Sequence, residues 1–275
     1  MSKRTKFVLI GAVLGLALWL VTFINVDYRF GSVLAVAAVS YVLSVWVLFD
    51  DIKGIEWMTL LVLPVMFTLG TGLFGNFLPS AVPSMFGRTF QIETQVFLAN
   101  AFKVLFYLFY VVGMYGILLI ENIFSVASIR TIQLFRAARS ASFIFTLITS
   151  LFFYTTALSL RLPFYWVASI TFVVNMLLSY TNLWSVDLKT PVYRNIYRFA
   201  LVASWLVALV SMTLSFWPVK PFMGGLMLTS VTYALIGILE QRLSNRVYLE
   251  GLVEYGISSL IIILIGYFTT SWIGY

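Results

Sequence analysis

Cysteine and histidine are both missing from this chain of 275 residues. Without a thiol or an imidazole, the chain cannot supply a cysteine nucleophile, a disulfide, a histidine general base, or a histidine ligand for zinc or haem. These absences exclude cysteine-based catalysis, the serine–histidine chemistry of intramembrane proteases, haem sites with cysteine or histidine ligands, and zinc sites with histidine ligands. We therefore expect neither a bound metal nor a cofactor.

Charge is also scarce, because only 10% of the residues are charged while 61% are hydrophobic. A soluble domain typically carries about 25% charged residues, so most of this protein's surface must face lipid. The net charge of +7 is typical of the positive-inside bias of membrane proteins. We expect no binding to nucleic acid, because no soluble domain is present to carry a basic face.

Long apolar runs fill the chain and predict an all-α, polytopic transmembrane helix bundle of about nine helices, forming a single domain over residues 1–275. Most of the tryptophans lie near the ends of these runs, as in the aromatic belts of membrane proteins. In the first run, Gly11 and Gly15 form a G-x-x-x-G pattern that favours close helix packing within the bundle. The predicted spans are 7–24, 31–49, 57–78, 97–120, 141–160, 164–184, 199–217, 222–239 and 251–271.

The distribution of lysine and arginine predicts the orientation. With the N-terminus in the cytoplasm, 12 of the 17 basic residues fall on the cytoplasmic side, as the positive-inside rule requires. We therefore expect Ser2 inside and Tyr275 outside, in a bacterial cytoplasmic (inner) membrane. The five basic residues expected outside are Arg29, Arg88, Lys103, Arg161 and Lys220.

The third predicted span is irregular. Pro64 is the only proline inside a span, and it cannot donate a backbone hydrogen bond to the carbonyl of Leu60, which predicts a kink. Gly70, Gly72 and Gly75 follow as further candidates for a helix break. Broken helices line cavities in transporters, so a transporter or channel is one functional hypothesis. A kink that serves only helix packing is the alternative.

The central stretch 117–139 connects the fourth and fifth spans and contains neither glycine nor proline. A single helix from about residue 97 to 160 would be roughly 95 Å long, about three times the thickness of a bilayer core. The chain must therefore bend here. We predict the break at Asn122 and Ser125, whose side chains can compete for backbone hydrogen bonds, and a cytoplasmic or interfacial amphipathic stretch over residues 121–139.

Three arginines in this stretch, Arg130, Arg136 and Arg139, are candidates for binding lipid headgroups or phosphate. A helix lying on an anionic leaflet would use such residues at the membrane surface. A helix that docks onto a protein partner through residues 121–139 is the alternative. The sequence does not determine the oligomeric state.

The segment 118–138 carries a resemblance to a known group of proteins. It reads Leu-Leu-Ile-Glu-Asn-Ile-Phe-Ser-Val-Ala-Ser-Ile-Arg-Thr-Ile-Gln-Leu-Phe-Arg-Ala-Ala, and it resembles uncharacterised multi-pass membrane proteins of candidate-phylum bacteria. The resemblance extends over most of the chain and implies a domain of unknown function. It brings no activity with it.

Acidic residues follow two of the predicted spans. Asp50, Asp51 and Glu56 come after the second span, and Asp187 comes after the sixth. This placement is similar to that of the aspartate-rich motifs that hold Mg²⁺ and a diphosphate in membrane aromatic prenyltransferases, which also have nine helices. The motifs themselves differ, because that family has three carboxylate or amide residues at four-residue spacing in the first and two aspartates in the second.

Three functions therefore remain open from the sequence. The first is a non-catalytic membrane component that binds lipid or a protein partner, and it needs the fewest special assumptions. The second is a transporter or channel built on the kinked third helix. The third is a prenyltransferase-like enzyme that acts on a lipid diphosphate, with the acidic residues pairing with nearby arginines as the structural alternative.

Overall fold

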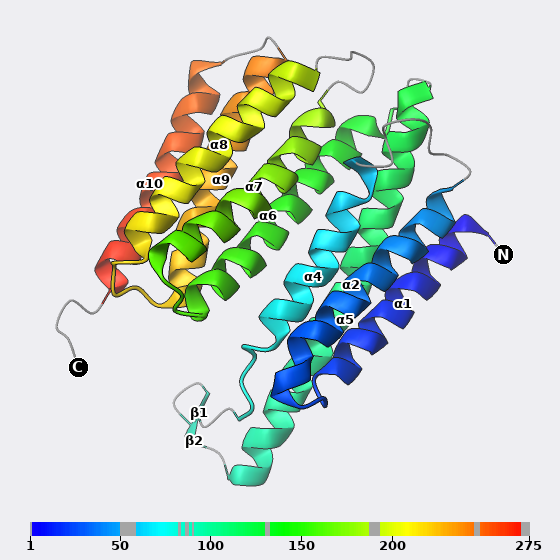
Figure 1. The fold of residues 1–275 in the computed structure, drawn as a ribbon, viewed down its shortest axis with the longest axis vertical. Helices are drawn as coiled ribbons and strands as arrows, with labels where there is room; N and C mark the ends of the chain where they lie inside the picture. The colour runs from blue at the N-terminus through cyan, green and yellow to red at the C-terminus, as the bar shows by residue number, and fades with distance from the viewer. Residues whose placement is uncertain are drawn as a thin grey trace. The chain divides into compact units, whose positions relative to one another are not determined.

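A computed structural model describes residues 2–49, 59–81, 84–85, 88–89, 91–129, 133–186, 193–244 and 248–270. Nine helices lie within these ranges, together with an antiparallel pair of two-residue strands, β1 (Ser84–Met85) and β2 (Arg88–Thr89) (Figure 1). The helices are α1 (Lys3–Val21), α2 (Val26–Leu48), α4 (Val62–Gly75), α5 (Ile92–Ile129), α6 (Phe135–Ser159), α7 (Phe164–Trp184), α8 (Tyr193–Leu214), α9 (Pro221–Leu243) and α10 (Leu249–Thr269).

Eight of the helices in the described ranges are long and apolar enough to cross a membrane. The prediction of an all-α polytopic helix bundle is thus confirmed. The remaining helix, α4, has 14 residues and so measures about 21 Å, whereas a bilayer core is about 30 Å thick. Within the described residues, the third predicted span therefore corresponds to a helix shorter than the other eight.

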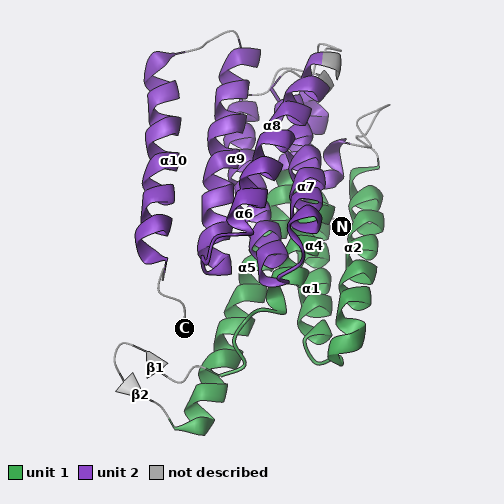
Figure 2. Cartoon of the chain, turned by 60° about the vertical axis from the view of Figure 1, so that its left-hand side comes forward, with its two compact units in different colours: residues 1–50, 64–119 green, residues 51–63, 120–275 purple. Residues whose placement is uncertain are grey.

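The residues group into two compact units, which Figure 2 shows in different colours. Unit 1 comprises residues 1–50 and 64–119, and unit 2 comprises residues 51–63 and 120–275. The expectation that the chain forms one domain stays a prediction.

In unit 1, two glycines of α1 allow α5 to approach closely. A Cβ atom on Gly11 would lie 2.9 Å from the carbonyl oxygen of Val111, and one on Gly15 would collide with the Val111 side chain. Only hydrogen atoms fit into these two positions. The G-x-x-x-G pattern is therefore used for packing inside the chain, as the sequence predicts.

A buried hydroxyl pair joins α4 to α5 in unit 1. The Thr68 hydroxyl donates to the carbonyl of Pro64 at 2.8 Å, and it lies 2.8 Å from the hydroxyl of Tyr110. Because Thr68 already donates its proton, Tyr110 donates to Thr68. The ring of Tyr110 also stacks on Phe67, with ring centroids 5.3 Å apart. Both hydroxyls are thus satisfied away from water, as a lipid environment requires.

In unit 2, α6, α7, α8 and α9 pack around a buried polar network. The Tyr154 hydroxyl of α6 donates to the Asn175 side-chain oxygen of α7 at 3.0 Å and lies 3.1 Å from the Thr232 hydroxyl of α9. The Asn175 amide nitrogen donates to the Ser204 hydroxyl of α8 at 3.2 Å. All four residues are fully buried, with 0% exposure. The network therefore cross-links four helices by hydrogen bonds rather than by apolar contact alone.

The helix break predicted in the central stretch is wrong in its position. Helix α5 runs without interruption through Asn122 and Ser125 to Ile129, and α6 begins at Phe135. Ser125 is fully buried. A packed helix in an apolar environment keeps its backbone hydrogen bonds because no water is available to replace them. Short polar side chains inside such a helix therefore do not end it.

The candidates for a break in the third span lie as follows. Thr59 and Leu60 are helical, Leu61 is a turn residue, and α4 begins at Val62. Pro64 thus lies in the first turn of α4, where a missing backbone N–H leaves no helical bond unmade. The three glycines follow within α4: Gly70 and Gly72 lie inside the helix and Gly75 ends it.

Candidate functional site

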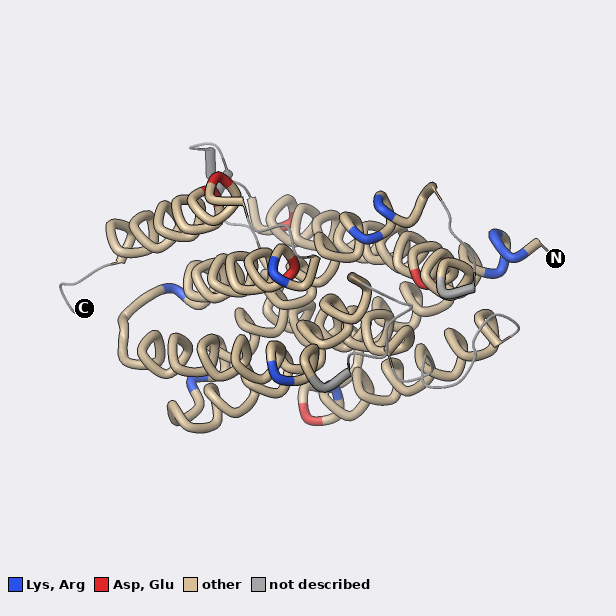
Figure 3. Tube along the Cα trace, turned by 90° about the horizontal axis from the view of Figure 1, so that it is seen from above, with Lys and Arg blue, Asp and Glu red and all other residues tan. Residues whose placement is uncertain are grey.

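One end of unit 2 collects arginine side chains from three helices. Arg136 lies in the first turn of α6, Arg198 lies near the start of α8, and Arg242 lies in the last turn of α9. All three side chains are exposed, and none forms an ion pair with a residue that the structure describes. Charged residues are few elsewhere, and most of the tube in Figure 3 is tan.

The helix dipole accounts for only one of these arginines. Arg242 lies in the last turn of α9, where a positive charge is favoured, and Arg198 is the sixth residue of α8, beyond the turn on which the dipole acts. Arg136 lies in the first turn of α6, which has no acidic residue. A positive charge there is disfavoured by about 0.3–1 kcal/mol, because the N-terminus of a helix is itself partly positive. Arg136 therefore lies where helix stability alone would place an acidic residue.

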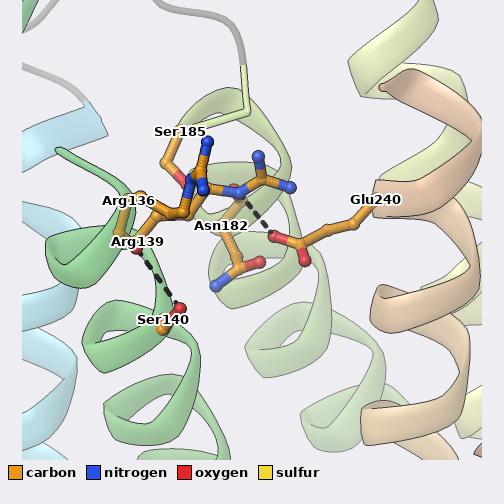
Figure 4. Close-up of polar contacts among 6 residues, drawn as sticks. All are labelled: Arg136, Arg139, Ser140, Asn182, Ser185 and Glu240. Atoms are coloured by element: carbon orange, nitrogen blue, oxygen red, sulfur yellow. Dashed lines mark hydrogen bonds and ion pairs between the residues drawn. The ribbon is translucent and has the colours of Figure 1, made fainter. Parts of the chain in front are cut away.

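Arg139 has a protein partner. Its Nε atom donates to Oε1 of Glu240 at 3.2 Å, which ties the start of α6 to the end of α9 (Figure 4). The two side chains are 25% and 16% exposed, so water still reaches both. A pair of this kind contributes about 1 kcal/mol or less. The guanidinium of Arg139 is thus engaged by a carboxylate, whereas none of the described carboxylates pairs with Arg136.

Beside this ion pair lies a buried asparagine that lacks hydrogen-bond partners. Asn182 of α7 is 1% exposed, and neither its side-chain oxygen nor its nitrogen has a partner in the described structure. Figure 4 shows its amide next to Arg139 and Glu240. The hydroxyl of Ser179, one turn earlier, is also buried and unpaired. Leaving such groups unpaired costs about 1–3 kcal/mol each.

The sequence analysis did not select Asn182 or Glu240. The signal for Asn182 was present, because an asparagine inside an apolar span is a rare polar group in a membrane segment. Glu240 gives no such signal, since a carboxylate at a span end is ordinary. Its role depends on the contact with a residue 101 positions earlier.

The predicted surface stretch 121–139 divides into two parts. Its first part continues α5, and Glu121 and Ser125 are 3% and 0% exposed. Its last part begins α6. Of the three predicted arginines, Arg130 lies outside the described residues, and the other two lie in the first turns of α6. The first part of the predicted amphipathic stretch is thus buried at its polar residues Glu121 and Ser125.

The four acidic residues that the sequence suggests as a diphosphate site all lie outside the described residues. They are Asp50, Asp51, Glu56 and Asp187. Within the described ranges, no group of three or more acidic side chains is arranged to hold a metal ion. A diphosphate site at these carboxylates stays a prediction.

The fold and the eight long apolar helices define a multi-pass α-helical membrane protein. Residues 51–269 match the model of a family described as a protein of unknown function, DUF5656. Because the match covers most of the chain, the protein belongs to this family. The domain of unknown function that the sequence resemblance implies is thereby confirmed. No curated protein and no solved structure matches the chain.

Proposed function

We propose that this protein is a non-catalytic component of the bacterial inner membrane that binds anionic lipid headgroups. The binding surface is the arginine end of unit 2, defined by Arg136, Arg198 and Arg242. The observation that carries the proposal is the gathering of three exposed arginines at one end of unit 2, without a carboxylate partner among the described residues. An external anion also accounts for the position of Arg136, which the helix dipole disfavours.

The energies favour this interpretation. Attraction to an anionic leaflet contributes about 1 kcal/mol for each basic residue near the surface. Three arginines would contribute about 3 kcal/mol, or roughly a hundredfold in affinity. Arg136, in the first turn of α6, opposes the dipole by about 0.3–1 kcal/mol, so attraction to lipid outweighs that cost.

An acidic residue at the same end of unit 2 behaves differently from Arg136. Glu250 lies in the first turn of α10, where the helix dipole favours a negative charge. Helix stability therefore accounts for Glu250, and it does not account for Arg136. An orientation with this end in the cytoplasm also agrees with the positive-inside rule, since the described part of the opposite end of unit 2 contributes only Arg161 and Lys220.

The test uses the full chain reconstituted into liposomes with and without phosphatidylglycerol. Replacing Arg136, Arg198 and Arg242 together by glutamine should reduce the preference for the anionic liposomes by roughly a hundredfold at low salt. The variant should fold normally, since the three side chains are exposed. Lys103→Gln is the control for loss of one charge in unit 1, and it should change the preference much less than the triple variant does.

A wild-type lipid preference in the triple variant would refute headgroup binding at this surface. The better explanation would then be a protein partner that docks onto residues 121–139. Crosslinking from Arg136→Cys in the otherwise cysteine-free chain would detect such a partner directly.

A further inference from the structure

The other end of unit 2 contains a cavity of about 560 Å³. It lies between the turn that joins α6 to α7 and the turn that joins α8 to α9, which Figure 1 shows beside each other. Small-molecule sites typically have volumes of about 300–1,000 Å³. Two cationic residues, Arg161 and Lys220, line this cavity together with Ser215, and none of its described lining residues is acidic.

Arg161 occupies a backbone position that favours glycine. Its φ angle is 49°, and among the described residues it is the only one other than glycine with a positive φ. It follows Leu160, the C-terminal cap of α6, and a helix that ends in this left-handed conformation most often uses glycine there. Glycine at position 161 would therefore fit this backbone conformation with less strain than arginine does.

Lys220 is also in a position that local structure does not explain. It is the N-terminal cap residue of α9 and makes no side-chain capping bond. Serine, threonine, aspartate or asparagine would cap the helix, and the dipole of α9 disfavours a positive charge at this point. Both turns therefore place a cation in the same cavity, where folding alone would select another residue.

Apolar side chains complete the cavity. Leu158, Val167 and Val219 contribute to its walls. A small hydrophilic anion would gain nothing from these contacts, whereas an amphiphile would use both the cations and the apolar walls. The cavity also lies at the ends of four membrane-length helices, where lipid headgroups are found.

We propose that this cavity binds the phosphate group of an anionic phospholipid. Arg161 and Lys220 contact the phosphate oxygens, and the apolar walls contact the glycerol and the first carbons of the acyl chains. Guanidinium groups suit this role because they donate two parallel hydrogen bonds to phosphate. The site is separate from the arginine end of unit 2, and neither proposal depends on the other.

Two substitutions test the site without weakening the fold. Arg161→Gly removes the guanidinium and supplies the residue that the backbone conformation favours. Lys220→Ser removes the ammonium and supplies a residue that can cap α9. Both variants should unfold at the wild-type temperature or above it. Arg4→Gln is the control, since it removes one exposed charge from the first turn of α1, outside unit 2 and outside both proposed sites.

Native mass spectrometry of the full chain in neutral detergent would measure bound lipid, with phosphatidylglycerol and phosphatidylcholine of identical acyl chains as probes. Each cavity variant should bind phosphatidylglycerol roughly tenfold more weakly, as expected for the loss of one charge-assisted hydrogen-bonding group. Phosphatidylcholine binding should change less than phosphatidylglycerol binding. The control Arg4→Gln should keep the wild-type occupancy of this cavity, which crosslinking of a photoactivatable phosphatidylglycerol to Ser215→Cys would report.

Three results would overturn the proposal. The first is wild-type affinity for phosphatidylglycerol in both cavity variants, together with wild-type crosslinking. The second is an equal loss of both lipids, which would mean that the cations do not select a net negative headgroup. The third is binding of glycerol phosphate as tight as that of the lipid, which would assign the site to a soluble phosphate compound instead.

Discussion

The close approach of α6 and α9 in unit 2 can be tested at Gly225. A Cβ atom added at this position would lie 3.0 Å from the backbone nitrogen of Thr155 and 3.1 Å from its Cα atom, and it would also collide with the Thr155 hydroxyl. The hydroxyl can rotate away, but the backbone atoms cannot. Alanine at Gly225 therefore forces one helix away from the other by a few tenths of an ångström.

The expected cost follows from two opposing effects. Overpacking a well-packed interface costs about 1–3 kcal/mol, while replacing glycine by alanine inside a helix gains up to about 1 kcal/mol in helix propensity. We expect Gly225→Ala to lower the free energy of unfolding by about 1–2 kcal/mol. For a chain of this size, each kcal/mol corresponds to about 2–4 °C in the unfolding temperature.

Thermal unfolding of the purified protein in one detergent, followed by circular dichroism, measures this effect. Gly256→Ala is the matched control, because a Cβ atom at Gly256 of α10 would meet no atom within 4 Å. The control should unfold at the wild-type temperature or slightly above it. Equal stability of the two variants would refute the inferred packing of α6 against α9 at this point.

Three further predictions concern other parts of the chain. Tyr154→Phe should lower the free energy of unfolding by about 1–2 kcal/mol, because it leaves buried polar groups without their partner. The control Tyr165→Phe, at an exposed tyrosine, should not change the free energy of unfolding. Equal melting temperatures of the two variants would contradict the hydrogen-bond network around Tyr154. Glu240→Gln should lower the free energy of unfolding by less than about 1 kcal/mol. It should also increase binding to phosphatidylglycerol, because it releases Arg139. Purely additive effects of Glu240→Gln and Arg139→Gln on the free energy of unfolding would show that the two residues are uncoupled. Reporter fusions at the two chain ends should lie on opposite sides of the membrane, and a shared side would exclude an odd number of spans.

The class and most helix positions of this protein could be read directly from the sequence. A helix that crosses lipid needs about 20 consecutive apolar residues, and it must satisfy its backbone hydrogen bonds by itself. Both requirements are local, so they leave a local pattern. The predicted span 164–184 has the same limits as α7, and the G-x-x-x-G pattern of α1 correctly predicts close packing.

Local patterns were not sufficient where neighbouring helices decide the outcome. Asn122 has the chemistry to interrupt a helix, yet α5 continues through it to Ile129. A residue's tendency to compete for backbone bonds is a weak preference, and the lack of water around a packed helix outweighs it. The place where α5 ends therefore could not be read from the polarity of the sequence.

The candidate sites were decided by the tertiary structure alone. Arg139 meets Glu240 across 101 positions of sequence, and Arg161 meets Lys220 in one cavity because the turns before α7 and before α9 lie side by side. Spacing along a chain determines which residues share a face of one helix. Which faces of different helices meet depends on side-chain packing among all of them, and this packing brings distant charges together.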